Sequence, residues 1–446
     1  MEERLLDSLA FARFLWQRIC TSPQTFWQQE VAPLVRRSDR VAGEIAVLAL
    51  VASRVRSDNV VGGVDVSVRD VFSVLLPTIR DERRLTLLAR FPETVLSLGV
   101  PSLIASHLGF TDQRCDVLVA GNLRDFADGR AGELEKTPVH IAHFHWLMNL
   151  AGSPGVMPSV MPKQEHSILH RALHPFYMNG SDAYVFTHSL FFVSDFGSAH
   201  VHDAFFRTLA EPLDAMLAWG LVDRNLDLLG ELLIGVCISG NWAFCRYAHI
   251  ACAVYFSAWN LVGALPQPGQ ADDGLANVYH ATLIGGLLCA VLLQQDVTLA
   301  DPAPSDAEPG PPWNVSWNAL WSDERLQRCQ NRLESLDKVW GDLQNQPGET
   351  ADCLRSDMQL IDLARRYDLD GLIYHLEQDV SRVAHHTLTF HEGIRLVRRQ
   401  LRSPECAARY GFRGKGLSVD AVERMLTQFL GKLPADMREE ASHVAG

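Results

Sequence analysis

The sequence predicts an all-α protein built from stacked helical hairpins. Apolar residues recur at spacings of three and four along most of the 446-residue chain, and no segment alternates apolar and polar residues as a half-buried strand does. Four strongly apolar stretches begin near Val139, Ala183, Leu226 and Val278. A period of about 45 residues with two helices per unit is typical of helical hairpins, either closed into a ring or left as an open solenoid.

Composition indicates a folded protein that does not bind nucleic acid. Hydrophobic residues make up 47% and charged residues 21% of the chain, which are ordinary globular values. The formal charge of −13 and the lack of a Lys/Arg-rich arm argue against a nucleic-acid partner. This length fits two or three ordinary domains or one large helical one.

The cysteines and the apolar runs favour a cytoplasmic location. The nine cysteines are an odd number without a CxxC pair, which is typical of reduced thiols. The N-terminus lacks the basic start of a secretory signal, and no uninterrupted apolar run reaches 18 residues, so no membrane partner is expected. Frequent Ala, Leu, Arg and Val favour a bacterial source.

The first 130 residues are expected to form short helices that pack on the core. Caps and Gly or Pro stops divide them, and residues 57–67 are the one expected loop or extended piece. The helices are expected at 4–20, 24–36, 39–56, 68–76, 81–91, 93–98, 101–108 and 113–128.

Residues 131–299 are expected to form the core, in which the four apolar stretches are the inner helices. Further helices are expected between them, at 164–174, 202–219 and 244–261. Residues 300–316, rich in Pro, Ala and Asp, predict an exposed linker. Residues 317–446 are expected to be a helical extension that closes or caps the ring, with a last helix at 418–430.

The segment 182–196 is the most informative of the inner helices. Asn179 offers N-cap chemistry and Gly197 a stop. On a helix Tyr184, His188, Phe191 and Asp195 share one stripe, which is aromatic and ionisable together. Because a buried His or Asp without a partner is costly, this stripe should face a polar network or a cavity.

Ionisable residues recur at matching positions of the inner helices. His143, His188, Glu231 and His280 follow one another at intervals of about 45 residues, and Asp227 shares the face of Glu231 at i, i+4. If the helices are neighbours in a ring, these side chains converge on one cavity. The expected catalytic residues are His188, Asp195, Asp227, Glu231 and His280, and the expected substrate contacts are Tyr184, Phe191 and Tyr279.

Such a set suits two chemistries. It could act as a general acid and base, because burial and a neighbouring carboxylate shift carboxyl and imidazole pKa values. His188, Glu231 and His280 could equally hold a divalent metal, with zinc favoured. In the alternative interpretation these residues cap helices and link them by buried hydrogen bonds.

Two other histidine groups are weaker candidates. His166, His170 and His174 fall at i, i+4 and i+8 of the helix expected at 164–174, which fits a metal site, an outer helix face or a cavity rim. His140 and His143 share a face of the helix that begins near residue 139, so one of them could join the cavity.

The turn before the last inner helix resembles a known family. Gln270-Ala271-Asp272-Asp273-Gly274, followed by Tyr279-His280, is similar to the α/α toroids of the terpenoid cyclase and protein prenyltransferase superfamily, whose hairpins carry Gln-x-x-Asp-Gly-x-Trp there. The resemblance covers about residues 130–300 and implies a central cavity lined by inner helices. Ala276 replaces the Trp, and the Asp-x-Asp-Asp, DDxxD and Cys-His-Gly motifs of the family's chemistries are absent.

These patterns favour an enzyme of bacterial specialised metabolism. Its substrate would be a small or peptide-like, partly apolar molecule, and lyase, cyclase or hydrolase chemistry fits better than redox because no redox-cofactor motif is present. The alternative is a non-catalytic helical-repeat scaffold or a small-ligand-binding protein. The sequence leaves a homo-oligomer open.

Overall fold

The computed structural model describes most of the chain. The described residues are 1–21, 38–55, 61–128, 137–152, 167–171, 173–199, 203–266, 275–297, 321–379 and 387–403, with Glu405 and Arg409. These residues form helices and turns, and none of them forms a strand, which confirms the all-α prediction.

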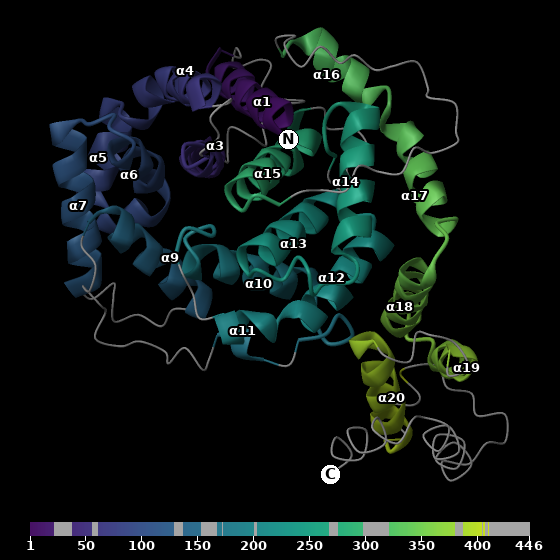
Figure 1. Cartoon of the computed structure of the whole chain (residues 1–446). Helices are drawn as coiled ribbons and strands as arrows, with labels where there is room; N and C mark the ends of the chain where they lie inside the picture. Colours follow the sequence, from purple (N-terminus) through teal and green to yellow (C-terminus); the bar gives the residue numbers. More distant parts are fainter. Residues whose placement is uncertain are drawn as a thin grey trace.

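The central feature is a closed circuit of helices (Figure 1). Its members in chain order are α3 (Ser38–Ala52), α6 (Val100–His107), α9 (Pro138–Leu150), α10 (Gly180–Val193), α13 (Leu226–Ile238) and α15 (Leu275–Gln294). Each helix packs against the next, and α15 packs against α3. Residues far apart in the sequence therefore face one interior.

A second set of helices lies outside this circuit. It comprises α1 (Glu2–Thr21), α4 (Val61–Ile79), α5 (Glu82–Arg90), α7 (Gln113–Asp128), α11 (Asp203–Arg207), α12 (Ala210–Val222) and α14 (Ala248–Val262). α1 packs on α15, α4 on α3, α7 on α6, and both α12 and α14 on α13. Inner and outer helices thus alternate along much of the chain, as helical hairpins require.

Helix α15 is the core of the molecule. Most of its residues are apolar, and all residues from Leu275 to Leu292, His280 included, are buried. By length and composition it is the one helix of the described residues that could cross a membrane. All of its apolar window is enclosed by the rest of the fold, which is the behaviour of a core helix in a soluble protein.

Gly286 lets α1 and α3 approach α15 closely. A Cβ at this position would overlap the Cβ of Ser8 and lie 3.1 Å from a methyl carbon of Leu48. We therefore expect Gly286→Ala to lower the free energy of unfolding by about 1–3 kcal/mol, measured by urea denaturation. Gly121→Ala in α7 is the matched control, because its Cβ meets nothing within 4 Å and should leave stability equal or higher. Equal stability of Gly286→Ala and the wild type would contradict this packing.

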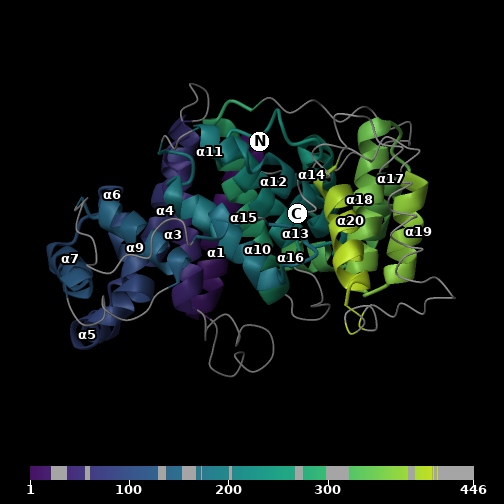
Figure 2. The ribbon, with the colours of Figure 1, turned by 90° about the horizontal axis from the view of Figure 1, so that it is seen from below.

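The C-terminal helices extend along the outside of the circuit. They are α16 (Asp323–Gln330), α17 (Leu336–Gln344), α18 (Glu349–Arg365), α19 (Leu369–Asp379) and α20 (Leu388–Leu401). α17 packs on α14 and α18 on α12, while α18, α19 and α20 share a separate small core. Figure 2 shows α17–α20 at the opposite end of the molecule from α5–α7.

Short helical turns complete the described structure. A 3-10 turn at Pro92–Thr94 and a π-helical turn at Val95–Gly99 lead into α6. Further 3-10 turns lie at Ile168–His170 and Leu333–Ser335.

Several expected elements differ from the structure. The loop expected at 57–67 is wrong from Val61 onward, because α4 begins there. The helix expected at 164–174 is reduced among the described residues to the turn Ile168–His170, so His170 and His174 do not form a row on one helix. His174 is instead buried, with its Nε2 3.2 Å from Oγ1 of Thr389.

The helices of the structure are also grouped differently from the parts expected from the sequence. α3 and α6 belong to the first 130 residues, yet they are members of the circuit itself. The described C-terminal helices pack on outer helices and do not cap the interior. The expected elements 24–36, 300–316 and 418–430, the segment Gln270–Gly274 and His166 lie outside the described residues.

Candidate functional site

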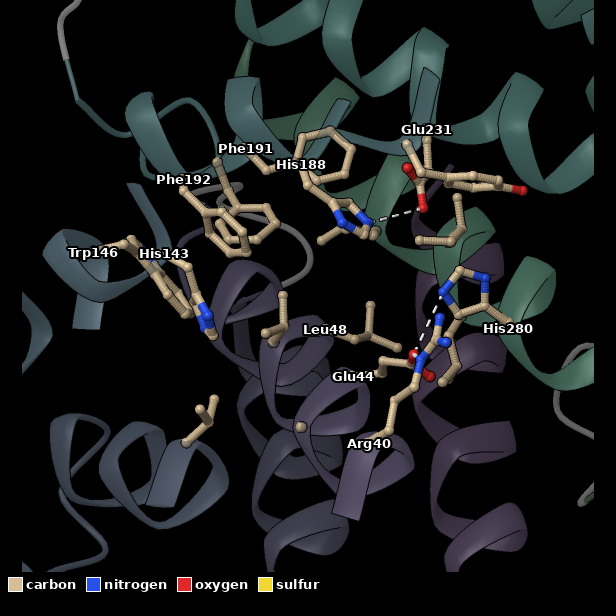
Figure 3. Close-up of a pocket in the computed structure, with 18 of the residues that line it drawn as sticks. Arg40, Glu44, Leu48, His143, Trp146, His188, Phe191, Phe192, Glu231 and His280 are labelled. Atoms are coloured by element: carbon tan, nitrogen blue, oxygen red, sulfur yellow. Dashed lines mark hydrogen bonds and ion pairs between the residues drawn. The ribbon is translucent and has the colours of Figure 1, made fainter. Parts of the chain in front are cut away.

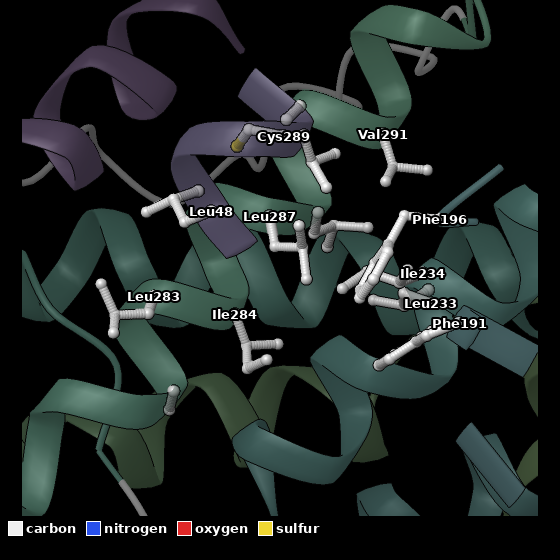
Figure 4. Packing of buried hydrophobic residues seen from close by; sticks show 14 of the residues in the cluster. Leu48, Phe191, Phe196, Leu233, Ile234, Leu283, Ile284, Leu287, Cys289 and Val291 are labelled. Carbon is white, nitrogen blue, oxygen red and sulfur yellow. The ribbon is translucent and has the colours of Figure 1, made fainter. Parts of the chain in front are cut away.

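The circuit encloses a cavity of about 720 Å³ with two unlike walls. Figure 3 shows Trp146, His143 and Phe192 on one side and Arg40, Glu44 and His280 on the other. Its apolar lining includes Leu48, Leu283, Ile284 and Leu287, which continue into the hydrophobic core seen in Figure 4. A molecule held here would meet charged groups on one side and aromatic rings on the other.

His280 is the centre of the charged side of the cavity. We call this side the charged wall, and its residues are Arg40, Glu44, His188, Asp227, Glu231 and His280. The Nδ1 atom of His280 lies 2.5 Å from Oδ1 of Asp227, and its Nε2 lies 3.5 Å from Oε1 of Glu44. Asp227 also accepts a hydrogen bond from the Tyr184 hydroxyl at 2.9 Å. Glu44 accepts one from Nε of Arg40 at 2.6 Å. Residues of α3, α10, α13 and α15 are therefore joined in one network.

The network keeps His280 protonated at neutral pH. Burial alone would lower the pKa of His280, but the charges of Asp227 and Glu44 outweigh it and raise the pKa to about 9. Burial likewise favours neutral Asp227, but the charge and hydrogen bond of His280 hold the pKa of Asp227 below its usual value. His280 and Asp227 are therefore a buried ion pair.

His188 forms a second imidazole–carboxylate pair. Its Nε2 lies 3.4 Å from Oε1 of Glu231, a side chain that is 0% exposed. The Thr187 hydroxyl donates to the other Glu231 oxygen, Oε2, and fixes the carboxylate. Burial lowers the pKa of His188, but Glu231 more than compensates, so the pKa is raised. Among the described residues no group bonds to Nδ1 of His188, and the side chain is 40% exposed where it lines the cavity.

Asp195 and Arg54 hold Trp146, a member of the aromatic wall, from outside the cavity. Its Nε1 donates to Oδ1 of Asp195 at 2.6 Å, and Nη2 of Arg54 donates to both oxygens of the same carboxylate at 3.0 Å. The rings of His143, Trp146 and Phe192 form a cluster in which each ring contacts the other two. Burial, with His140 and His188 nearby, lowers the pKa of His143 to about 4, so its ring is neutral.

One comparison places the chain in a family. The sequence profile of a domain of unknown function, DUF6895, matches residues 21–290. The chain belongs to the DUF6895 family. The matched region runs from before α3 to residue 290 of α15, so it contains almost the whole circuit and every cavity residue named above. No curated protein and no solved structure matches the chain, so the resemblance to the terpenoid cyclase toroids stays a prediction.

Within the DUF6895 region, most of the expected site residues meet at the cavity. Its lining includes His143, Tyr184, His188, Phe191, Asp227, Glu231 and His280. Tyr279 is not part of the lining and is buried. Asp195 is a correction: α10 ends at Val193, and Asp195 adopts a left-handed φ of 46° that turns its carboxylate toward Arg54 and Trp146.

Sequence reasoning missed the contribution of α3. Arg40 and Glu44 fall at i, i+4 near the start of a helix, a pattern that usually marks a solvated surface pair. They reach the cavity because α15 packs against α3. The ionisable residues at the recurring inner-helix positions indicate that buried partners must exist. No local sequence pattern, however, identifies α3 as the helix that supplies them.

Proposed function

We propose that this protein is an enzyme in which His188 transfers protons to and from a partly apolar small molecule in the cavity. The observation that carries the proposal is the arrangement of the His188 ring. One nitrogen faces the buried carboxylate of Glu231, and the other is open to the cavity. A histidine held in this way by a carboxylate has a fixed tautomer and one nitrogen free for the substrate.

The raised pKa of His188 supports protonation of the substrate as the first step. Because its pKa is raised, His188 carries its proton more readily than a free histidine, so it suits protonation of a substrate by Nδ1–H. Once that proton has left, Nδ1 is a base, and the Glu231 carboxylate, 3.4 Å from Nε2, favours the tautomer that keeps a proton on Nε2. A single residue can thus serve as acid and then as base, which fits lyase, cyclase or hydrolase chemistry.

His280 fits a structural role better than a catalytic one. Both of its nitrogens face carboxylates, so neither is open to the cavity as Nδ1 of His188 is. The predicted metal site of His188, Glu231 and His280 needs a free nitrogen on each ring. Among the described residues, no three His, Cys, Asp or Glu side chains are grouped as a metal site. Proton transfer without a metal is therefore the chemistry that we propose.

The proposal also includes the cellular location and the metabolic role of the protein. The described cysteines are all free, which suits a reducing compartment such as the cytoplasm. A role in bacterial specialised metabolism fits a cavity that is apolar over much of its wall.

The test is turnover in a pool of small molecules. Wild type, His188→Gln and His107→Gln are incubated with the pool, and the compounds are followed by mass spectrometry. His107 is an exposed histidine at the end of α6 and is the matched control. We expect compounds that wild type and His107→Gln consume and that His188→Gln leaves, with a rate loss of at least about a hundredfold. Equal consumption by His188→Gln would exclude this role, and consumption by none of the three would favour a ligand-binding protein.

A further inference from the structure

We infer that the ligand of this cavity is an organic carboxylate with a flat apolar body, its carboxylate bound between Arg40 and His188 and its body lying against Trp146 and Phe192. The inference rests on the proposed function, because it names the substrate class of the same site. It depends on which polar atoms of the charged wall a ligand can reach.

The reachable groups of this wall are donors. Arg40 uses Nε to bind Glu44, and among the described residues its two Nη atoms make no hydrogen bond, while its side chain is 56% exposed. His188 likewise presents an unbonded Nδ1 from a side chain that is 40% exposed. A guanidinium edge and an imidazole N–H are among the groups that proteins use to bind carboxylates.

The acceptors lie behind these donors. Glu231 is 0% exposed, and both oxygens of Asp227 are occupied by His280 and Tyr184. The Oε2 atom of Glu44 is buried, and its Oε1 faces Arg40 and His280. A cationic ligand would therefore find the carboxylates of Glu231, Asp227 and Glu44 buried or already paired, with only Asp39 exposed among the described lining residues, whereas an anion would find both donors open.

The charges of the cavity are compatible with the same class of ligand. Arg40 and the ion pair of His280 with Asp227 lie beside Glu44 and Glu231, while Asp39 at the lining pairs with Arg84 outside it. Burial lowers the pKa of His188 and the charge of Glu231 raises it, and the net shift is upward. An anion bound beside Arg40 and His188 shifts this pKa further upward and favours the protonated imidazole.

The opposite wall fits a flat apolar body. Trp146, neutral His143 and Phe192 stack face to face or tilted at ring-centroid distances of 4.6–6.0 Å. Neutral rings of this kind offer a large apolar contact area to the ligand and carry no charge that would compete for its carboxylate. Asp195 and Arg54 fix the indole from behind, so the wall is formed before the ligand arrives.

Isothermal titration calorimetry with three probes of one shape tests the inference. The probes are 3-phenylpropanoate, its neutral amide 3-phenylpropanamide and the cation 3-phenylpropylammonium. We expect the carboxylate to bind wild type about tenfold or more tightly than the amide, and the ammonium to bind most weakly. Arg40→Gln should lose about tenfold in affinity for the carboxylate and leave amide binding unchanged.

Arg69→Gln is the matched control, since it removes the same charge from an exposed position of α4. Equal affinity for carboxylate and amide, tighter binding of the ammonium, or no measurable carboxylate binding would overturn the inference. The proposed function fails separately. If carboxylates bind as expected but His188→Gln retains turnover in the pool, the inferred ligand class is confirmed and the catalytic role of His188 is excluded. If His188→Gln loses turnover while the probes show no preference for the carboxylate, the catalytic role of His188 is confirmed and the inferred ligand class is excluded.

Discussion

Asp227→Ala is expected to lower the free energy of unfolding by about 3–5 kcal/mol, the loss typical of breaking a buried ion pair from one side. The change leaves His280, whose side chain is 5% exposed, without its shortest partner, and it removes the acceptor of the Tyr184 hydroxyl. Urea denaturation at pH 7 measures the loss. Asp337→Ala is the control, because Asp337 is an exposed partner of Arg224 and should cost less than about 1 kcal/mol.

The same ion pair makes stability depend on pH in a definite direction. The folded pKa of His280, about 9, lies above its ordinary value of 6.5, so its stabilising contribution is complete below about pH 6.5 and is lost as pH rises toward 9. Asp227 has the opposite shift, and its contribution changes only in acid, below its ordinary value of 3.8. Only His280 of this pair therefore titrates above neutrality.

The comparison of wild type with His280→Gln isolates this effect. Burial also raises the pKa values of thiols such as those of Cys237 and Cys289. In alkali these thiols lower the free energy of unfolding of wild type and of His280→Gln equally. From pH 7 to 8.5 we expect wild type to lose about 2 kcal/mol more than His280→Gln, on the scale of 1.4 kcal/mol per pH unit. Parallel pH profiles would show that His280 is not protonated in the folded protein.

Asp195→Ala is expected to destabilise the protein by about 2–4 kcal/mol and to weaken carboxylate binding as well. It removes the acceptor of the buried Trp146 indole and the partner of Arg54. It also places alanine at a φ of 46°, a left-handed conformation that asparagine and aspartate tolerate better.

Asp195→Asn separates these contributions. Asparagine accepts the left-handed backbone and keeps one oxygen for Trp146, so we expect about half of the loss seen with alanine. Urea denaturation and calorimetry with 3-phenylpropanoate measure the two effects. If Asp195→Ala binds the probe as wild type does, then the aromatic wall does not depend on this carboxylate.

The sequence was most informative where helical periodicity and a long repeat agreed. The recurrence of His143, His188, Glu231 and His280 predicted that inner helices bring them together, and the structure places all four at one cavity. The sequence also predicts the long helices α13 and α15, because a helix that is buried on every side needs apolar residues on all its faces.

The sequence was least informative where a distant contact decides local structure. Gly197 looked like the stop of the helix, but α10 ends at Val193, because Asp195 and Phe196 are left-handed and Arg54 bonds to the carbonyl and carboxylate of Asp195. His174 similarly lies off any helix, and its ring meets Thr389 from the C-terminal helices. Neither partner is visible in the local pattern.

The closure of the helical circuit has a consequence for how the chain folds. α3 ends at Ala52, whereas its neighbour α15 begins only at Leu275, so the contact between them joins segments that lie far apart along the polypeptide. Closing such a long loop costs conformational entropy, and proteins with many contacts of this kind fold more slowly. Glu44 and His280 sit on the two sides of that seam. The charged wall therefore forms only after His280 of α15 has been synthesised.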